Sequence, residues 1–374
     1  MPILRIIANI SEIPTAQWDA LTGGNPVLSH AFLGALRESG CATPETGWRE
    51  QHLTLWQDEA LVGAMPLYLK NHSWGEFVFD WGWAEAHRRQ GLDYYPKLLC
   101  AVPFTPVSGP RLLAPTPELR AELLRSALRL AQETGVSSLH CLFPAKAQAE
   151  EMREHGMMLR QGVQFHWRNP GYADFDAYLA GMSHDKRKRI KQERRKVREA
   201  GITFEHLSGD RISDAHWAFF ERCYAETHRQ YQAPPALNLD FFRRIGAAMA
   251  DNILLVIASR DGQPIAAALN FHHQEALYGR SWGALEYHPG LHFETCYYQT
   301  IEFCIARRIP LFEGGAQGEH KLSRGFLPET TWSAHWLARP HFARAVDDFL
   351  RRETRGMSCH MDELNERSPF KQPG

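Results

Sequence analysis

The chain has 374 residues, of which 44% are hydrophobic, 23% charged and 11% aromatic, so it can bury a sizeable core. Its formal net charge of −1 excludes a globally basic nucleic-acid binder, and no stretch approaches the roughly 20 apolar residues of a membrane helix. Seven widely spaced cysteines without a Cys-x-x-Cys pair argue against a disulfide scaffold or a structural zinc site. We expect a cytoplasmic protein of two domains.

The first half predicts an α/β alternation. Apolar periodicity and turn residues set the boundaries of its elements. The expected helices are 11–21, 29–39 and 117–133. The expected strands are 1–8, 51–57, 61–70, 136–143 and 161–167, with the polar pair Asp58-Glu59 as a hairpin turn.

A long loop over 71–95 combines large aromatic residues with charges. Such a mixture suits the wall of a binding pocket, and it equally suits rings that plug a core beneath a long loop. As candidate substrate-binding residues we select Asp80, Tyr94, Tyr95 and Lys97.

The junction between the two halves is almost wholly basic over 186–198, where only Ile190 and Val197 are apolar. We expect this helix to lack a buried face and to direct its charges into water or onto an anionic partner such as tRNA or an anionic lipid. The candidate phosphate or RNA contacts are Arg187, Lys188, Lys191, Arg194 and Arg195.

The second half repeats the element order of the first: a strand, two helices and a hairpin, here with Asp261-Gly262 at the turn. The expected helices are 215–228, 239–250, 293–307 and 342–352. The expected strands are 202–207, 253–259, 264–271, 277–283, 309–312 and 330–337. The domains expected are two α/β lobes over 1–172 and 201–362, a basic helical junction over 173–200 and a frayed tail over 363–374.

The stretch 312–326 contains three glycines in its first half and then an imidazole, an ammonium and a guanidinium. Glycines let a backbone approach a ligand closely, so this stretch predicts an active-site loop, with a solvated connection as the alternative. Acyl transfer to an amine needs a base, an oxyanion partner and anchors for carrier phosphates. We assign Glu313 as base, Lys321 as oxyanion or phosphate partner and Arg324 as a second anion ligand; a structural ion pair of Glu313 with Lys321 or Arg324 is the rival interpretation.

Several motifs together resemble the FemAB-like family, which belongs to the GNAT superfamily of N-acyltransferases. They are Tyr278-Gly279 with Trp282, Leu291-His292-Phe293-Glu294, the Gly-Gly-Ala-Gln-Gly-Glu-His-Lys run that ends at Lys321, and Gly325-Phe326. The resemblance covers nearly the whole chain. It implies a tandem pair of GNAT-like lobes, each a mixed sheet flanked by helices, with Lys321 at the reaction centre. His320 departs from the aromatic Phe of Fem ligases, and the usual acetyl-CoA pyrophosphate loop is absent from 283–293.

The resemblance implies acyl or aminoacyl transfer to an amine, as in peptidoglycan precursors, with acyl-CoA or aminoacyl-tRNA as co-substrate and no tightly bound cofactor or metal. The alternative is a non-catalytic protein that binds a peptide, a glycan or a polyanion. His320 joins Glu313 and Lys321 as a catalytic candidate. The further candidate substrate contacts are Gln317, Tyr278, Arg280, Trp282, His292 and Glu294.

Overall fold

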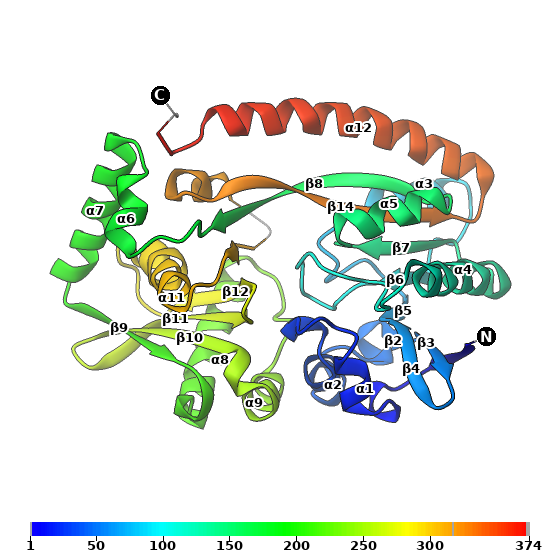
Figure 1. Ribbon diagram of the computed structural model, residues 1–374, viewed down its shortest axis with the longest axis horizontal. Helices are drawn as coiled ribbons and strands as arrows, with labels where there is room; N and C mark the ends of the chain where they lie inside the picture. The colour runs from blue at the N-terminus through cyan, green and yellow to red at the C-terminus, as the bar shows by residue number, and fades with distance from the viewer. Residues whose placement is uncertain (1, 316–317, 372–374) are drawn as a thin grey trace. The chain divides into compact units, whose positions relative to one another are not determined.

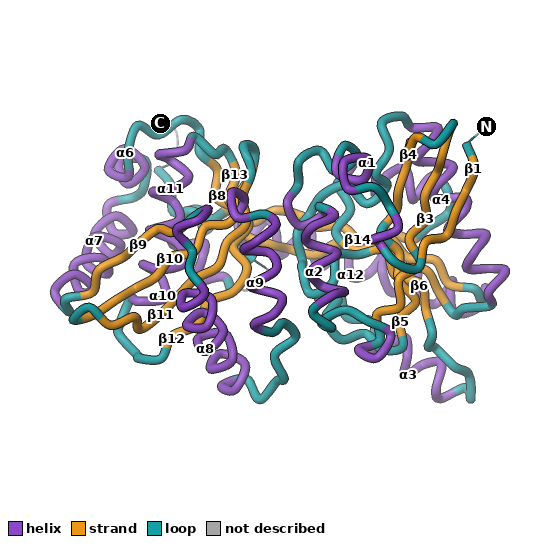
Figure 2. The backbone as a smooth tube through the Cα atoms, turned by 90° about the horizontal axis from the view of Figure 1, so that it is seen from below, coloured by secondary structure: helices purple, strands orange, loops and turns teal. Residues whose placement is uncertain are grey.

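A computed structural model describes residues 2–315 and 318–371 (Figures 1 and 2). The chain folds into two compact units. Unit 1 comprises Met1–Gly162 and Thr330–His360, and unit 2 comprises Val163–Glu329 and Met361–Gly374. The sequence predicted that 330–360 belongs to the second lobe, whereas in the structure this segment joins the first unit.

Unit 1 contains a small antiparallel sheet, β1-β3-β4, and a mixed sheet in the order β2-β5-β6-β7-β14. Its strands are β1 (Ile3–Ile7), β2 (Trp48–Glu50), β3 (His52–Gln57), β4 (Ala60–Met65), β5 (Leu67–Lys70), β6 (Lys97–Cys100), β7 (Ser138–Leu142) and most of β14 (Leu327–Leu337). Asp58 and Glu59, with φ of 48° and 68°, form the predicted turn between β3 and β4. Positive φ at both central residues is what a tight hairpin turn requires.

The helices of unit 1 are α1 (Thr15–Asp19), α2 (His30–Glu38), α3 (Trp81–Arg89), α4 (Pro117–Thr134), α5 (Lys146–Glu154) and most of α12 (Pro340–Glu366). The predicted single strand over 61–70 is wrong, because Pro66 separates β4 from β5 and the two strands lie in different sheets. Proline cannot donate to a strand ladder, which explains the break. The expected loop over 71–95 contains α3, which the sequence reading missed.

Unit 2 contains a mixed sheet in the order β8-β13-β12-β11-β10-β9. Its strands are the part of β8 (Met158–Arg168) from Val163 onward, β9 (Ile202–Leu207), β10 (Ile253–Arg260), β11 (Gln263–His272), β12 (Ala276–Ala284) and β13 (Leu311–Glu313). β12 and β13 are parallel, and the other pairs are antiparallel. The predicted hairpin turn is confirmed, since Asp261 and Gly262 have φ of 52° and 74°.

The helices of unit 2 are α6 (Phe175–Ala180), α7 (His184–Glu199), α8 (Asp214–Gln230), α9 (Leu239–Ala248), α10 (Leu291–Phe293) and α11 (Gln299–Arg307). Figures 1 and 2 show α8 and α9 on one face of the sheet and α11 on the other. A π-helical segment, Glu294–Tyr298, joins α10 to α11 and packs against β10 and β11. Both units are mixed sheets flanked by helices, which confirms the predicted pair of α/β lobes.

Two expectations about unit 2 are wrong. α7 does bury a face, because Ile190 and Val197 are 1% and 2% exposed and pack in the core. The tail is not frayed where the structure describes it: α12 runs to Glu366, Leu364 is fully buried, and Phe370 packs on the same core as Ile190. Among the described residues, none of the helices combines the length and apolar character that a membrane crossing requires.

Candidate functional site

The candidate catalytic loop follows β13 in unit 2. After Glu313 come Gly314 and Gly315, and a 3-10 helix over Glu319–Arg324 then carries Lys321. A Cβ added at Gly314 would lie 2.9 Å from the ring of Phe326 and 3.3 Å from Cδ of Lys321. Glycine at 314 therefore lets the lysine stem pack directly on the backbone, which a larger residue would prevent.

Lys321 is the central group of this loop. It is 3% exposed, and its Nζ donates a hydrogen bond to the carbonyl oxygen of Gly315 at 2.9 Å. Within the part of the chain that the structure describes, this ammonium has no carboxylate partner. Burial lowers the pKa of Lys321 to about 8, against a smaller opposing effect of Cys296. The site thus keeps a cation in a poorly solvated place, where its attraction for a developing negative charge is stronger than in water.

Two imidazoles lie beside each other near this lysine. His320 shares a hydrogen bond with the Tyr297 hydroxyl at 3.1 Å, and its ring is 5.8 Å from that of His292. Burial, reinforced by Lys321 and Arg324, lowers the pKa of both histidines, that of His292 to about 3. Both rings are neutral at neutral pH, so each has one ring nitrogen that can accept a hydrogen bond.

Arg324 fixes the loop to α7. It is 1% exposed, and it donates one hydrogen bond to the carbonyl oxygen of His320 at 2.7 Å and one to Glu193 at 2.8 Å. Its guanidinium lies 3.3 Å from the ring centroid of Phe293. The predicted role of Arg324 as an anion ligand stays a prediction, and the structure adds a structural role as the bond between loop and helix.

Glu313 ends β13 and is 5% exposed. Its carboxylate lies 4.0 Å from Nε2 of His166, a residue of β8 that sequence reasoning missed. Burial lowers the pKa of His166 to about 3, so this imidazole is neutral beside the carboxylate. The carboxylate that pairs with Arg324 is Glu193 and not Glu313.

Of the predicted substrate contacts in unit 2, Trp282 and His292 lie together beside the candidate catalytic loop. Trp282 lies against His292, with ring centroids 4.6 Å apart, and so belongs with the imidazoles. Tyr278 is buried on β12 and its hydroxyl contacts His273 at 3.1 Å, while burial lowers the pKa of its strand neighbour Arg280 to about 10. Glu294 pairs with Arg194 at 2.9 Å. Gln317 lies outside the described residues.

α7 has an inner and an outer face. On the inner face Arg194 binds Glu294 and Glu302, while Glu193 accepts hydrogen bonds from Arg324 and from Tyr298 of the π-helical segment. Such π-helical turns are frequent at functional sites. The outer face exposes Lys188, Lys191, Arg195 and Arg198, which recur at helical spacing. The inner face therefore positions the loop, and the outer face remains accessible to an anion.

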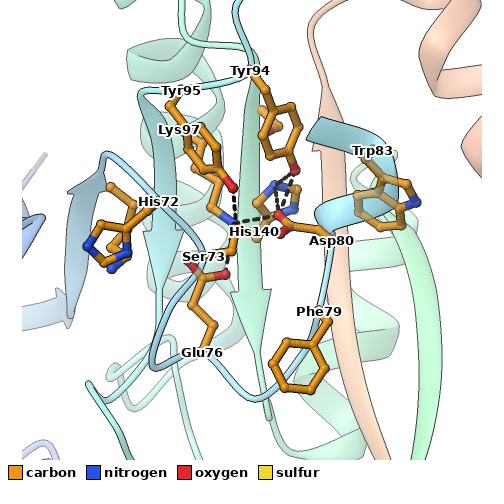
Figure 3. Close-up of polar contacts among 12 residues, drawn as sticks. His72, Ser73, Glu76, Phe79, Asp80, Trp83, Tyr94, Tyr95, Lys97 and His140 are labelled. Atoms are coloured by element: carbon orange, nitrogen blue, oxygen red, sulfur yellow. Dashed lines mark hydrogen bonds and ion pairs between the residues drawn. The ribbon is translucent and has the colours of Figure 1, made fainter. Parts of the chain in front are cut away.

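Unit 1 contains a second cluster of buried charges, which we call the Lys97 cluster (Figure 3). Lys97 on β6 donates to Ser73 at 2.9 Å and to Glu76 at 2.8 Å, and it also contacts Asp80. Tyr94 donates to Asp80 at 2.6 Å and contacts His140 of β7 at 3.0 Å. The sequence predicted Asp80, Tyr94 and Lys97 here, with Tyr95; it missed Ser73, Glu76 and His140.

In the Lys97 cluster the charged forms of Lys97 and Asp80 are stabilised on balance by their neighbours, whereas that of Glu76 is not. Burial opposes the ammonium, but Glu76 and Asp80 outweigh it and raise the pKa of Lys97. Burial also opposes the carboxylate of Asp80, whose pKa Lys97 and His140 nevertheless lower. For Glu76 burial prevails and raises the pKa to about 7, and its Oε1 lacks a hydrogen-bond partner among the described residues.

Lys70 lies next to this cluster at the end of β5. Its ammonium is 3.6 Å from the ring centroid of Trp48 and donates to the carbonyl oxygen of Trp74 at 3.3 Å. The residue is fully buried, and burial lowers its pKa to about 7. No signal in the sequence distinguishes this lysine from an exposed one at the end of a strand.

Unit 2 thus places a buried lysine, two neutral imidazoles and a glycine backbone at the end of a mixed sheet. Three solved structures share the fold. FemX gives a TM-score of 0.57 at 10% identity over 90% of this chain and 98% of FemX. L-PGS from Bacillus licheniformis gives 0.56 at 10% identity over 90% and 96%. A protein of unknown function from Bacteroides thetaiotaomicron VPI-5482 gives 0.50 at 12% identity over 89% and 99%.

A family model confirms the resemblance seen in the sequence. The FemAB-like model, described as peptidoglycan biosynthesis/recognition, matches residues 9–372. The chain belongs to the FemAB-like family. None of the curated proteins matches the sequence.

Proposed function

We propose that this protein transfers an acyl or aminoacyl group to the amine of a peptidoglycan precursor or a related metabolite, with Lys321 as the oxyanion partner. The observation that carries the proposal is the ammonium of Lys321, which is 3% exposed and has a carbonyl oxygen but no carboxylate as its partner in the described part of the chain. A buried cation without a counter-ion attracts a ligand that brings negative charge.

The reaction requires one bond to form and one to break. The acceptor amine attacks the carbonyl carbon of the donor, a C–N bond forms, and the ester or thioester bond to the carrier breaks. The ammonium of Lys321 stabilises the negative charge that develops on the carbonyl oxygen. The amine proton goes to Glu313 or to the neutral imidazole of His320, and the carrier leaves as an alcohol or a thiol after it receives a proton.

The donor is a phosphate-bearing carrier, either aminoacyl-tRNA or acyl-CoA. The exposed outer face of α7, with Lys188, Lys191 and Arg195, supplies cations for its phosphates. Lys191 and Arg195 have only loose ion pairs, with Asp176 at 3.5 Å and Glu199 at 3.7 Å, so a phosphate can compete for them. Arg194 is bound to two carboxylates and is less available.

Among the candidate ligand contacts of unit 1, Tyr95 is more accessible than its buried neighbours. Asp80, Tyr94 and Lys97 are at most 4% exposed, and they bind one another. Tyr95 is half-buried, and its hydroxyl contacts Ser73 at 2.7 Å. In this proposal the Lys97 cluster fixes the local structure of unit 1, and Tyr95 is the residue of this group that a ligand can contact.

The test is a transfer assay with the purified protein against aminoacyl-tRNA and acyl-CoA donors and amine-bearing precursor fragments, with products identified by mass spectrometry. Lys321→Ala should lower the rate by about 10²- to 10³-fold, the typical loss of one oxyanion donor. The matched control is Lys146→Ala, which removes an exposed lysine of α5 in unit 1.

An unchanged rate in Lys321→Ala would refute the assignment of this residue. Donor binding without any transfer product, with steep salt dependence, would instead identify a polyanion-binding protein. Glu313→Gln and His320→Gln distinguish the two candidate bases. The substitution that removes the general base should lower the transfer rate by about 10²- to 10⁴-fold.

A further inference from the structure

In the segment 73–81 of unit 1, polar side chains are buried and large aromatic side chains are exposed, which is the opposite of the usual pattern. Its polar residues Ser73, Glu76 and Asp80 are at most 3% exposed. Its large aromatic residues are the exposed ones: Trp74 at 66%, Phe77 at 41%, Phe79 at 50% and Trp81 at 45%. Burial of charges and exposure of rings both oppose folding, so an arrangement that combines them points to a surface with a binding role.

Three of the exposed rings form one cluster, which we call the aromatic surface: Trp74, Phe79 and Trp81. The ring centroids of Trp74 and Trp81 are 5.4 Å apart, and those of Phe79 and Trp81 are 4.8 Å apart. Phe77 has a φ of 63°, a backbone conformation that bulky residues rarely adopt. Strain of this kind persists where surrounding contacts fix the backbone, and it is common at ligand sites.

The Lys97 cluster and a neighbouring arginine hold the aromatic surface outward. Glu76 and Asp80 reach inward to Lys97, and Arg160 donates to the carbonyl oxygen of Phe79 at 2.8 Å. Figure 3 shows Asp80 directed toward Lys97 and Phe79 directed away from it. The buried contacts thus fix the rings before any partner binds, which reduces the entropy lost on binding.

The charges around the rings suit an anionic partner. Both carboxylates of 71–81 are buried against Lys97, so this segment presents no exposed negative side chain. At the other end of α3, Arg88 and Arg89 are 74% exposed and share one carboxylate, that of Glu85. Two exposed guanidinium groups against one carboxylate leave this end of the helix positive, and Trp81 at its first residue is of the ring type that enters the interface of a bilayer.

We infer that the aromatic surface docks the protein on an anionic lipid bilayer. The rings enter the interface between head groups and acyl chains, and Arg88 and Arg89 lie over the anionic head groups. This inference goes beyond the transfer reaction and does not depend on it, because docking can be measured without turnover.

The experiment is flotation of the full-length protein with vesicles of phosphatidylglycerol and phosphatidylethanolamine, compared with phosphatidylcholine alone. Binding should favour the anionic vesicles and shift the tryptophan emission to shorter wavelength. The triple variant Trp74→Ala, Phe79→Ala, Trp81→Ala should lose at least about 30-fold in affinity, since each ring buries apolar area in the interface. Trp74→Ala alone should lose roughly 3- to 10-fold and is the test if the triple variant does not fold.

Two control variants make the result specific. Tyr231→Ala with Tyr287→Ala removes two exposed rings of unit 2, 79% and 89% exposed, and should leave vesicle binding unchanged. Lys188→Gln with Lys191→Gln removes charge from the outer face of α7 and should lower vesicle binding by less than threefold.

Three results would overturn the inference. The first is equal vesicle binding by Trp74→Ala and the unaltered protein. The second is loss of vesicle binding in the α7 variant, which would assign the bilayer to α7. The third is no binding to either kind of vesicle, with tryptophan quenching by a soluble glycan fragment, which would assign the rings to a sugar.

Discussion

The lowered pKa of Lys321 predicts that the rate of the transfer reaction declines above a specific alkaline pH. Burial lowers its pKa from 10.5 to about 8, which corresponds to a bias of roughly 3 kcal/mol toward the neutral amine. At pH 7 the ammonium still exceeds the amine by about ten to one. If the ammonium stabilises the oxyanion, the ionisation of Lys321 should not change kcat/KM below pH 7, and kcat/KM should fall about tenfold per pH unit above 8.

The assay is kcat/KM between pH 6 and 10 for the unaltered protein and for Lys321→Arg. A guanidinium stays charged over this whole range, so the arginine variant should lose the alkaline decline even if its rate at pH 7 is lower. A decline that originates from the acceptor or the carrier would remain in both proteins. If the rate of the unaltered protein rises through pH 8 and the rise is absent in Lys321→Arg, Lys321 acts as a base and the oxyanion role is refuted.

Three further substitutions test the electrostatics of the two units. Lys97→Met leaves Glu76 and Asp80 buried without their cation, so urea denaturation at pH 7 should show a loss of about 3–5 kcal/mol, smaller at pH 5 where Glu76 is protonated. Lys70→Met should raise the free energy of unfolding at pH 7 by about 3 kcal/mol. Burial lowers the pKa of Lys70 to about 7, and this shift destabilises the folded state by about 5 kcal/mol. Attraction of the ammonium to the ring of Trp48 stabilises the folded state by about 2 kcal/mol, which leaves the net difference. Because the unfolded chain binds more protons than the folded one between pH 7 and 10.5, stability should rise with pH in that window, and this slope should disappear in the variant. Glu193→Gln should lower kcat about 10- to 10²-fold with little change in donor KM, because Glu193 acts through Arg324 on the catalytic loop, and Glu193→Asp should recover part of the loss.

The elements that the sequence predicted well are those with a strong local signal. The hairpin turn at Asp261-Gly262 has the residues that positive φ favours, the polar pair Asp58-Glu59 interrupts two apolar runs, and the leucines of α4 recur at helical spacing. α3 was missed because its segment exposes aromatic residues and buries charged ones, which inverts the pattern on which such a prediction rests. The inner face of α7 was missed because it is built from ion pairs such as Arg194 with Glu294, and these partners are 100 residues apart.

The candidate catalytic loop could be recognised in the sequence because its members are contiguous, from Glu313 to Arg324. The Lys97 cluster was only partly visible, because β6, β7 and the segment before α3 each contribute to it. In the sequence His140 is indistinguishable from the other residues of a buried strand. No neighbouring residue in the sequence indicates that its imidazole contacts Tyr94. Long-range polar contacts of this kind depend on strand register, which sequence periodicity alone does not determine.

The lysines of the two units show why burial alone does not identify a functional group. Lys97 and Lys321 are buried to a similar degree, at 0% and 3% exposure. Two carboxylates raise the pKa of Lys97, so its charge is satisfied within the fold and its role is structural. Lys321 has only a carbonyl oxygen, and its pKa falls. The free energy that folding loses at Lys321 can be recovered when a ligand brings the missing negative charge, and a transition state that develops an oxyanion does so more fully than its substrate.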